Sequence, residues 1–214
     1  MRLRNVKNKK EILENSKYLI KNPQAHIGEW EYLFGNDNPI FIEIGMGKGK
    51  FIIENALKYP DINFIGIEKY DSVVAKCLPK IPANINNLII IRMDALEIDQ
   101  VFSNEIDRIY LNFSDPWPKV RHTLRRLSSK VFLSKYDNIF RKDKVIYMRT
   151  DNRDLFTYSL ESFSQYGYGL YDISLDLHSV GLELITTEYE DKFSSEGMPI
   201  YSVVAIKDDE ENDK

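Results

Sequence analysis

A short, rigid segment holds the residues with the clearest chemical potential. It reads Asn112-Phe-Ser-Asp-Pro-Trp-Pro118, with Asp115 directly before the first of two prolines. Each proline fixes its own φ near −65° and restricts the residue before it, so the segment has few accessible conformations. A fixed Asp115 carboxylate can accept hydrogen bonds from a base edge, and the Trp117 ring can stack on a base for about 1–3 kcal/mol. The alternative is a kinked loop that buries its tryptophan and binds nothing.

Basic side chains follow this segment directly. Residues 116–136 contain six lysines and arginines and no acidic residue. Because arginines bind phosphates bidentately and stack on bases, we predict that Arg121, His122, Arg125 and Arg126 contact RNA. A solvated basic loop is the common alternative, and the position beside the rigid segment favours RNA contact.

A glycine-rich turn forms a second candidate site. It reads Glu43-Ile-Gly-Met-Gly-Lys-Gly49 and follows an apolar run at 40–44. Glycines at alternate positions, beginning with Gly45, let the backbone turn tightly and approach a ligand closely. The spacing is G-x-G-x-G and not the G-x-G-x-x-G of dinucleotide enzymes. A tight strand-to-helix turn without a ligand is the alternative.

Two acidic residues end the next two predicted strands. Glu68 follows the glycines by about 20 residues, where a carboxylate can accept both hydroxyls of a ribose. Asp94 ends the third strand and can accept from an adenine amino group. A solvated acid is the alternative for Glu68, and a helix N-cap is the alternative for Asp94. Because NAD enzymes use the same ribose contact, Glu68 indicates an adenosine-type cofactor without identifying it.

The elements that must position these residues alternate along the chain. Short apolar runs predict strands at 40–44, 63–67, 88–91, 106–113, 144–148, 168–176 and 200–206. Amphipathic segments predict helices at 50–58 and 71–78, a helix N-capped by Ser128 or Ser129, and one N-capped by Asp151. This alternation predicts an α/β fold with a doubly wound, mostly parallel sheet, in which ligands bind at the carboxyl ends of the strands.

Length and composition favour one domain in a reducing compartment. The 214 residues suit an N-terminal arm at 1–36, one α/β domain at 37–207 and an acidic tail at 208–214. Cys77 is the only cysteine, and no apolar stretch approaches the roughly 20 residues that span a bilayer. We therefore expect a cytoplasmic protein without a membrane partner. The histidines and Cys77 show no ligand spacing, so no metal is expected.

The glycine turn and the two strand-end acids together resemble the class I methyltransferase family. The resemblance implies a Rossmann-like fold and S-adenosylmethionine (SAM) as cofactor, with Glu43, Gly45, Glu68 and Asp94 near it.

A closer resemblance runs from about residue 40 to residue 201. Its motifs are Asp115-Pro-Trp-Pro-Lys119, Arg121-His122, Arg125-Arg126-Leu127, Thr150-Asp151-Asn152, Thr187-Glu-Tyr-Glu190, Lys192-Phe193 and Gly197-x-Pro-Ile-Tyr201. In this order they are similar to the bacterial tRNA (guanine-N7-)-methyltransferase family. The family's target is a guanine in the tRNA variable loop.

The family resemblance also implies residue roles. Asp115 is the proposed active-site residue and also contacts the cofactor. The segment 121–126 contacts RNA. The residues implied to contact the substrate guanosine are Lys119, Asp151, Thr187, Glu188, Tyr189 and Glu190.

Two departures from the family pattern stand in the basic segment. Val120 and Leu124 occupy positions where the family usually has further basic or polar residues. With about 0.7–0.9 units of salt slope per phosphate contact, we expect weaker tRNA binding without its loss.

Three other functions compete with N7 methylation. An Asp-Pro-Trp loop also resembles those of methyltransferases that act on exocyclic amino groups. A non-catalytic RNA-binding subunit on the same fold is a second alternative, against which the intact glycine turn and Glu68 argue. A nicotinamide dehydrogenase is disfavoured by the glycine spacing. The oligomeric state and the set of tRNAs used do not follow from the sequence.

Overall fold

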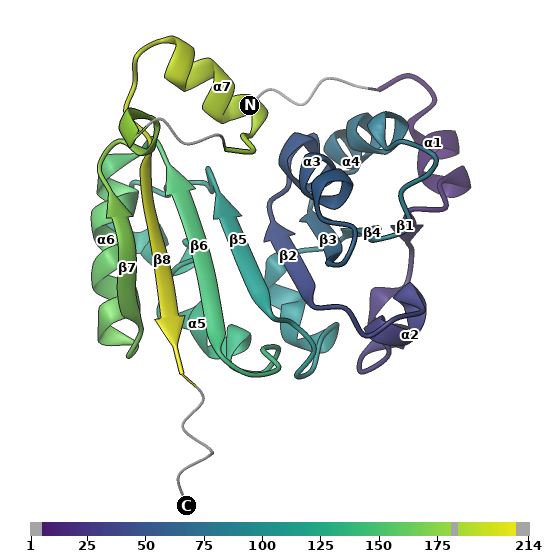
Figure 1. Cartoon of the computed structure of the whole chain (residues 1–214), viewed down its shortest axis with the longest axis horizontal. Helices are drawn as coiled ribbons and strands as arrows, with labels where there is room; N and C mark the ends of the chain where they lie inside the picture. Colours follow the sequence, from purple (N-terminus) through teal and green to yellow (C-terminus); the bar gives the residue numbers. More distant parts are fainter. Residues whose placement is uncertain (1–5, 181–183, 209–214) are drawn as a thin grey trace, which may run out of the picture.

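The computed structural model describes residues 6–180 and 184–208, and strands alternate with helices through most of them. The strands are β1 (Leu19–Ile20), β2 (Ile40–Ile44), β3 (Asn63–Glu68), β4 (Leu88–Arg92), β5 (Arg108–Asn112), β6 (Lys144–Thr150), β7 (Gly169–Ser174) and β8 (Tyr201–Lys207). Within the described ranges these eight strands form one sheet in the order β1-β4-β3-β2-β5-β6-β8-β7 (Figure 1).

Most neighbouring strands run parallel. The exception is β8, which lies antiparallel between β6 and β7. The strand order reverses at β2, which pairs with β3 on one side and with β5 on the other. The predicted mostly parallel, doubly wound sheet is therefore confirmed. Its switch point places a ligand crevice at the carboxyl ends of β2 and β5.

Helices cover both faces of this sheet (Figure 1). They are α1 (Lys9–Asn15), α2 (Trp30–Phe34), α3 (Lys50–Lys58), α4 (Asp71–Cys77), α5 (Lys130–Tyr136), α6 (Arg153–Gln165) and α7 (Glu188–Ser195). Short 3-10 helices lie at Pro23–His26, Leu78–Lys80, Ala95–Gln100, Val120–Arg125 and Leu177–Val180. Side chains of α2, α5 and α6 join the hydrophobic core on one face, and those of α1, α3 and α4 join the core on the other.

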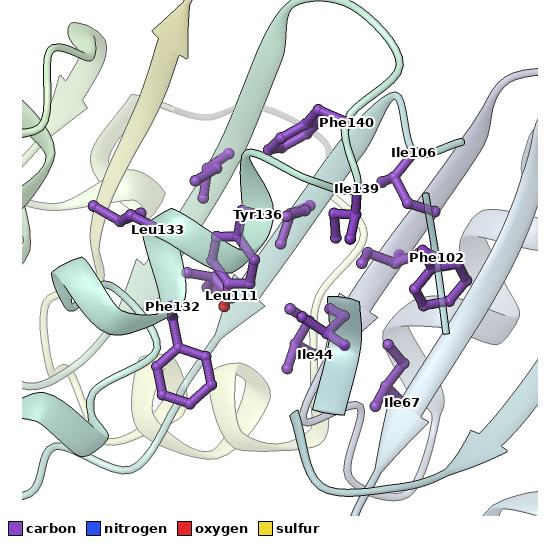
Figure 2. Close-up of a cluster of buried hydrophobic side chains, with 14 of the residues drawn as sticks. Ile44, Ile67, Phe102, Ile106, Leu111, Phe132, Leu133, Tyr136, Ile139 and Phe140 are labelled. Carbon is purple, nitrogen blue, oxygen red and sulfur yellow. The ribbon is translucent and has the colours of Figure 1, made fainter. Parts of the chain in front are cut away.

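Figure 2 shows the first of these cores, between α5 and the strands. Phe132, Tyr136, Ile139 and Phe140 are buried there. The helix itself ends at Tyr136, so Ile139 lies in the turn beyond it, and Phe140 forms a β-bridge with Ile106. Aromatic and branched side chains are buried on both faces and hold the sheet between its helices. This packing fixes the positions of the strand ends that carry the candidate site.

The N-terminal segment packs onto the sheet. Strand β1 pairs in parallel with β4 at the sheet edge. The Trp30 side chain is fully buried, and its Nε1 donates to the Val101 carbonyl at 2.9 Å. The division of the chain at residues 36 and 37 stays a prediction. The described residues do not include 1–5. They also do not include 209–214, which make up most of the expected acidic tail.

One predicted helix cap is wrong, and the other is confirmed in position only. Asn152, and not Asp151, caps α6, because its Oδ1 accepts from the Leu155 amide at 2.8 Å. Ser129 occupies the N-cap position of α5, but its hydroxyl donates to the Leu124 carbonyl. The error at Asp151 arises because neighbouring polar residues have similar capping propensities. Across residues 6–180 and 184–208, no helix has the length and apolar character needed to cross a membrane.

Candidate active site

A cavity of about 440 Å³ opens at the carboxyl ends of β2, β3, β4 and β5. It gathers residues that lie far apart in the sequence, and much of the predicted site lines it. The predicted residues at its wall are Glu43, Gly45, Glu68, Asp94, Asp115, Arg125, Thr187, Glu188 and Tyr189. The cavity therefore brings together the glycine turn, the strand-end acids, the rigid loop and the start of α7.

The glycine turn after β2 needs glycine for its backbone shape. Gly45, Gly47 and Gly49 have φ values of 82°, 58° and 83°, in the left-handed region that other residues rarely adopt. A Cβ atom on Gly49 would also lie 2.4 Å from the Cys77 sulfur. The turn can therefore bring backbone close to a ligand in the cavity without side chains in between.

Glu68 fastens the glycine turn to the end of β3. Its Oε2 accepts from the Gly47 amide at 3.2 Å, and its Oε1 accepts from the Lys69 and Tyr70 amides at 2.8 and 3.0 Å. Burial raises the pKa of the Glu68 carboxyl above its ordinary value, and the nearby Asp115 charge acts in the same direction. The carboxylate therefore orders two cavity loops.

Glu43 is the most deeply buried acid of the cavity wall. The Asn112 side-chain amide, on the neighbouring strand β5, donates to Glu43 Oε1 at 2.9 Å. Within the described residues, Glu43 Oε2 has no hydrogen-bond partner. Burial raises the pKa of Glu43 to about 7. Asn112 was not predicted as a site residue, and only its position at a strand end beside Glu43 could have indicated it.

Asp94 caps the 3-10 helix at Ala95–Gln100, which was the alternative to its predicted cofactor contact. Its Oδ1 accepts from the Leu96 amide at 3.1 Å, and the Lys69 ammonium donates to Oδ2 at 2.6 Å. Although burial favours the neutral acid, the Lys69 and Leu96 hydrogen bonds lower the pKa of Asp94 below its ordinary value. Asp94 is thus ionised at the wall of the cavity, where it can still accept from a ligand.

The rigid loop after β5 presents Asp115 to the cavity. The Asp115 side chain is exposed, and Trp117 is half-buried. Trp117 has a φ of 42° and Phe113 a φ of 51°, both unusual for residues other than glycine. The Arg125 guanidinium lies 5.0 Å from the centre of the Trp117 ring, and the His122 ring meets it edge-on at 5.7 Å. The loop thus combines a carboxylate, an aromatic ring and a cation at one place.

The basic segment divides into exposed and buried members. Lys119, Arg121 and Arg125 are exposed, and His122 is half-buried. Arg126 is only 7% exposed, and its Nε donates to the Pro116 carbonyl at 2.9 Å. The structure therefore places Arg126 in the interior, apart from the exposed cations with which the sequence groups it.

Helix α7 contributes part of the cavity rim and begins with a capping box. The Thr187 hydroxyl accepts from the Glu190 amide at 3.0 Å, and Glu190 accepts in return from the Thr187 amide. Glu190 is fully buried, and its carboxylate lies 3.3 Å from the Arg149 guanidinium and 3.1 Å from His178 Nε2. The start of α7 is therefore locked by an internal ion pair that the sequence did not reveal.

Two lysines fasten α7 to the glycine side of the cavity. Lys80 donates to Glu188 Oε1 at 2.8 Å and to the Lys48 carbonyl at 3.1 Å. Lys50, the first residue of α3, forms an ion pair with Asp191. These lysines were missed because nothing in their local sequence indicates a partner more than 100 residues away. They hold α7 at the edge of the cavity. Figure 1 shows this helix above the upper ends of the strands.

Lys119 and Asp151 lie outside the cavity wall. Lys119 is exposed at the end of the rigid loop, and Asp151 is half-buried just after β6. Since Asn152 caps α6, Asp151 is not needed for that role. Throughout the part of the chain that the structure describes, no cluster of three or more His, Cys, Asp or Glu side chains could hold a metal ion.

The chain is similar in sequence to known methyltransferases. A family model described as a putative methyltransferase matches residues 37–203. A tRNA (guanine-N(7)-)-methyltransferase of Lachnoclostridium phytofermentans is 49% identical over 214 residues, covering 98% of this chain and 100% of the relative. The enzyme of the same name from Bacillus subtilis is 50% identical over 193 residues, covering 89% of this chain and 91% of the relative.

Solved structures show the same fold at low sequence identity. An antibiotic-related methyltransferase superposes with a TM-score of 0.63 at 19% identity, covering 85% of this chain and 94% of that one. A 16S rRNA (adenine(1408)-N(1))-methyltransferase from Catenulisporales acidiphilia, solved with cosubstrate SAM, superposes with a TM-score of 0.60 at 11% identity. The match covers 85% of this chain and 91% of that one. These likenesses confirm the Rossmann-like methyltransferase fold. On the near-complete match to its sequence relatives, the chain belongs to the tRNA (guanine-N(7)-)-methyltransferase family.

Proposed function

We propose that this protein transfers a methyl group from SAM to N7 of a guanine in the variable loop of tRNA. One observation carries the proposal for this chain: a single cavity joins the glycine turn, the acids Glu43 and Glu68, and the rigid Asp115 loop. Membership of the family supplies the substrate class.

The cavity residues fit the parts of SAM. Glu68 lies at a strand end where a carboxylate can accept the ribose hydroxyls, and Asp94 can accept from the adenine amino group. The glycine turn, including Gly45, allows close approach of the backbone. When bound, SAM supplies an electrophilic methyl group on a positively charged sulfur. The Asp115 carboxylate provides negative potential for that charge.

The chain's own residues must align the target base. N7 of guanine exposes a lone pair and carries no proton, so the transfer requires no general base. The Asp115 loop supplies a fixed carboxylate where positive charge spreads into the purine ring, and such preorganised charge lowers the barrier. Trp117 offers a ring face for stacking. The start of α7 forms one wall of the cavity in which the base must lie.

The rim residues are proposed to recognise the guanosine. Thr187, Glu188 and Tyr189 line the cavity, and carboxylates suit the N1–H and N2–H₂ donors of guanine. Lys119 and Asp151 stand beside the cavity as further contacts. Glu190 is fully buried beneath this rim, so we assign it to holding Thr187 and Tyr189 in place.

Exposed cations beside the cavity are proposed to bind the tRNA backbone. Lys119, Arg121 and Arg125 are exposed, and His122 lies between them in the 3-10 helix. Their charge is local, because screening limits the influence of distant acids to about 8–10 Å. A protein of net charge −4 can therefore present a positive surface at its active site.

Product mapping tests the proposed function. Unmodified tRNA is incubated with the protein and SAM carrying a labelled methyl group, and the product is cleaved chemically at 7-methylguanine. We expect strand scission at one guanine of the variable loop. Label on an exocyclic amino group would assign the chain to amino methylation. The absence of both SAM binding by calorimetry and label transfer would indicate a non-catalytic subunit.

A further inference from the structure

We propose that Arg126 is a positioning residue for methyl transfer, which holds the Asp115 loop in its working shape from the protein interior. The inference deepens the proposed function and rests on it, because that function makes the loop part of the reacting site. It also separates Arg126 from Arg125, its neighbour in the basic segment.

The guanidinium of Arg126 bonds to two successive loop carbonyls. Its Nε donates to the Pro116 oxygen at 2.9 Å, and its Nη2 donates to the Trp117 oxygen at 3.3 Å. The guanidinium presents its donors in a rigid planar fork that can serve two acceptors at once. Because the side chain is just 7% exposed, little of this cation is available to a phosphate in solution.

The carbonyls that Arg126 binds belong to a strained backbone. Trp117 has a φ of 42° and Phe113 a φ of 51°, so both non-glycine residues lie in the left-handed region. Each such residue is disfavoured by about 1–2 kcal/mol and persists only where its surroundings hold it. Asp115 lies between them. Loss of the Arg126 bonds is therefore expected to relax the loop and to shift the Asp115 carboxylate.

The other contact of Arg126 ties this loop to α6. Its guanidinium lies 4.3 Å from the centre of the Tyr158 ring, on the first half of that helix. Helix α6 begins two residues after Asp151, which is proposed to contact the guanosine. Arg126 thus connects the strand-end loop of β5 with the element that follows β6. Arg125 points the other way, since it is exposed, lines the cavity and stacks on Trp117.

Hydrogen exchange measured by mass spectrometry tests whether Arg126 holds the Asp115 loop, without relying on activity. The variants are Arg126→Ala, Arg126→Lys and Arg125→Ala, with Lys142→Ala as a control at an exposed lysine before β6. We expect faster exchange in peptides covering residues 113–119 in both Arg126 variants. Lys142→Ala should exchange there as the wild type does. Arg125→Ala removes only a contact with the Trp117 ring and should change the exchange less than the Arg126 variants do. Wild-type exchange in the Arg126 variants would overturn the proposal.

Kinetics on unmodified tRNA provide the second readout. A misplacement of about 1 Å can reduce a rate about 100-fold, so we expect kcat to fall roughly 10- to 100-fold in Arg126→Ala. The salt dependence of tRNA binding should stay that of the wild type. Arg125→Ala should instead weaken tRNA binding and lower the salt slope by about one unit, as expected for a phosphate contact.

The Arg126→Lys variant distinguishes a residue that holds the Asp115 loop from one that binds a tRNA phosphate. It also serves as the test if Arg126→Ala does not fold. Lysine keeps the positive charge but lacks the fork, so kcat should fall with an unchanged salt slope. A wild-type kcat in the lysine variant, or a salt slope lowered by one unit in the alanine variant, would show that Arg126 contacts RNA instead. If the wild type fails to methylate guanine N7, the proposed function is wrong, while the exchange comparison still decides whether Arg126 braces the loop.

Discussion

Two buried carboxylates, Glu43 and Glu68, face the same cavity but differ in how many hydrogen bonds they accept. Glu68 accepts three backbone amide hydrogen bonds, which stabilise its ionised form and offset part of the effect of burial. Glu43 has one amide partner, Asn112, and an unpartnered Oε2 among the described residues. Burial therefore dominates at Glu43 and raises its pKa to about 7.

The raised pKa of Glu43 predicts a pH-dependent stability. Between about pH 4.5 and 7 the folded protein keeps the Glu43 proton, whereas the unfolded chain releases it. The contribution of the neutral acid is thus fully present below pH 4.5 and is lost as the pH rises through 7. At about 1.4 kcal/mol for each pKa unit, the loss amounts to roughly 3 kcal/mol.

Urea unfolding of Glu43→Gln at pH 5 and pH 8 measures this effect. Glutamine resembles the protonated acid at every pH, so the variant should gain stability relative to the wild type as the pH rises. Glu97→Gln, at an exposed carboxyl of the same charge, serves as the control. If wild type and Glu43→Gln lose stability in parallel from pH 5 to pH 8, the assignment of a neutral Glu43 is wrong.

At the scale of residues, the sequence predicts which side chains gather but not which way each one faces. Arg125 and Arg126 are chemically alike and adjacent, yet one stacks on Trp117 at the surface and the other is buried against Pro116. Their directions depend on how a 3-10 helix of six residues joins α5. Asp151 and Asn152 are equally good helix caps, and only the register of α6 selects Asn152.

At the scale of elements, α7 is held by contacts with β6, α3 and the Leu78–Lys80 turn. Its capping box at Thr187 and Glu190 fixes the first turn, which carries Tyr189 at the cavity rim. The exposed ion pairs contribute little individually, typically less than about 1 kcal/mol. The buried cap, together with the buried ion pair of Arg149 and Glu190, is therefore expected to dominate the local stability of α7.

Replacement of Thr187 tests this dominance. Thr187→Ala removes the oxygen that accepts from the Glu190 amide, and loss of such a cap weakens a helix by about 1 kcal/mol. That change corresponds to about fivefold faster hydrogen exchange in peptides covering residues 188–195. Thr187→Ser keeps the accepting oxygen and should exchange as the wild type does. Equal exchange in the alanine and serine variants would mean that other contacts hold the helix.

Seven of the eight strands in the described residues were predictable, because their apolar runs differ sharply from the amphipathic helices between them. Strand β1 was missed, because its two residues are too short to form such a run. The glycine turn and the acids Glu68 and Asp94 fall at strand ends in both the sequence pattern and the structure. The insertion of β8 between β6 and β7 was not predictable, because an apolar run does not encode its neighbours or direction. Nor could α7 be placed, since its partners Lys50 and Lys80 lie in distant elements.

At the scale of the whole molecule, charge is distributed unevenly around the cavity. The net charge is −4, but no acidic residue interrupts residues 116–136. Lys119 and Arg121 are exposed beside the Asp115 loop. Val120 and Leu124 are also exposed there, so the positive surface is interrupted by apolar side chains. We expect tRNA affinity to depend on the few cations that remain.

The salt dependence of tRNA binding reports on those cations. Arg121→Ala should weaken binding and reduce the slope of log affinity against log salt by about one unit, because one phosphate contact is lost. Lys142→Ala, on the loop before β6, removes the same charge away from the cavity and should keep the wild-type slope. An unchanged slope in Arg121→Ala would place the tRNA on another surface.

The most direct test of the account is the single-turnover methylation rate of Asp115→Asn at saturating tRNA and SAM. The variant keeps the shape of the side chain and removes its charge, so tRNA affinity should remain close to that of the wild type. We predict that the rate of methyl transfer to guanine N7 falls by roughly 10²–10³, the range for losing one preorganised electrostatic contact. A rate close to that of the wild type would contradict the account and leave Asp115 as a residue that only shapes its loop.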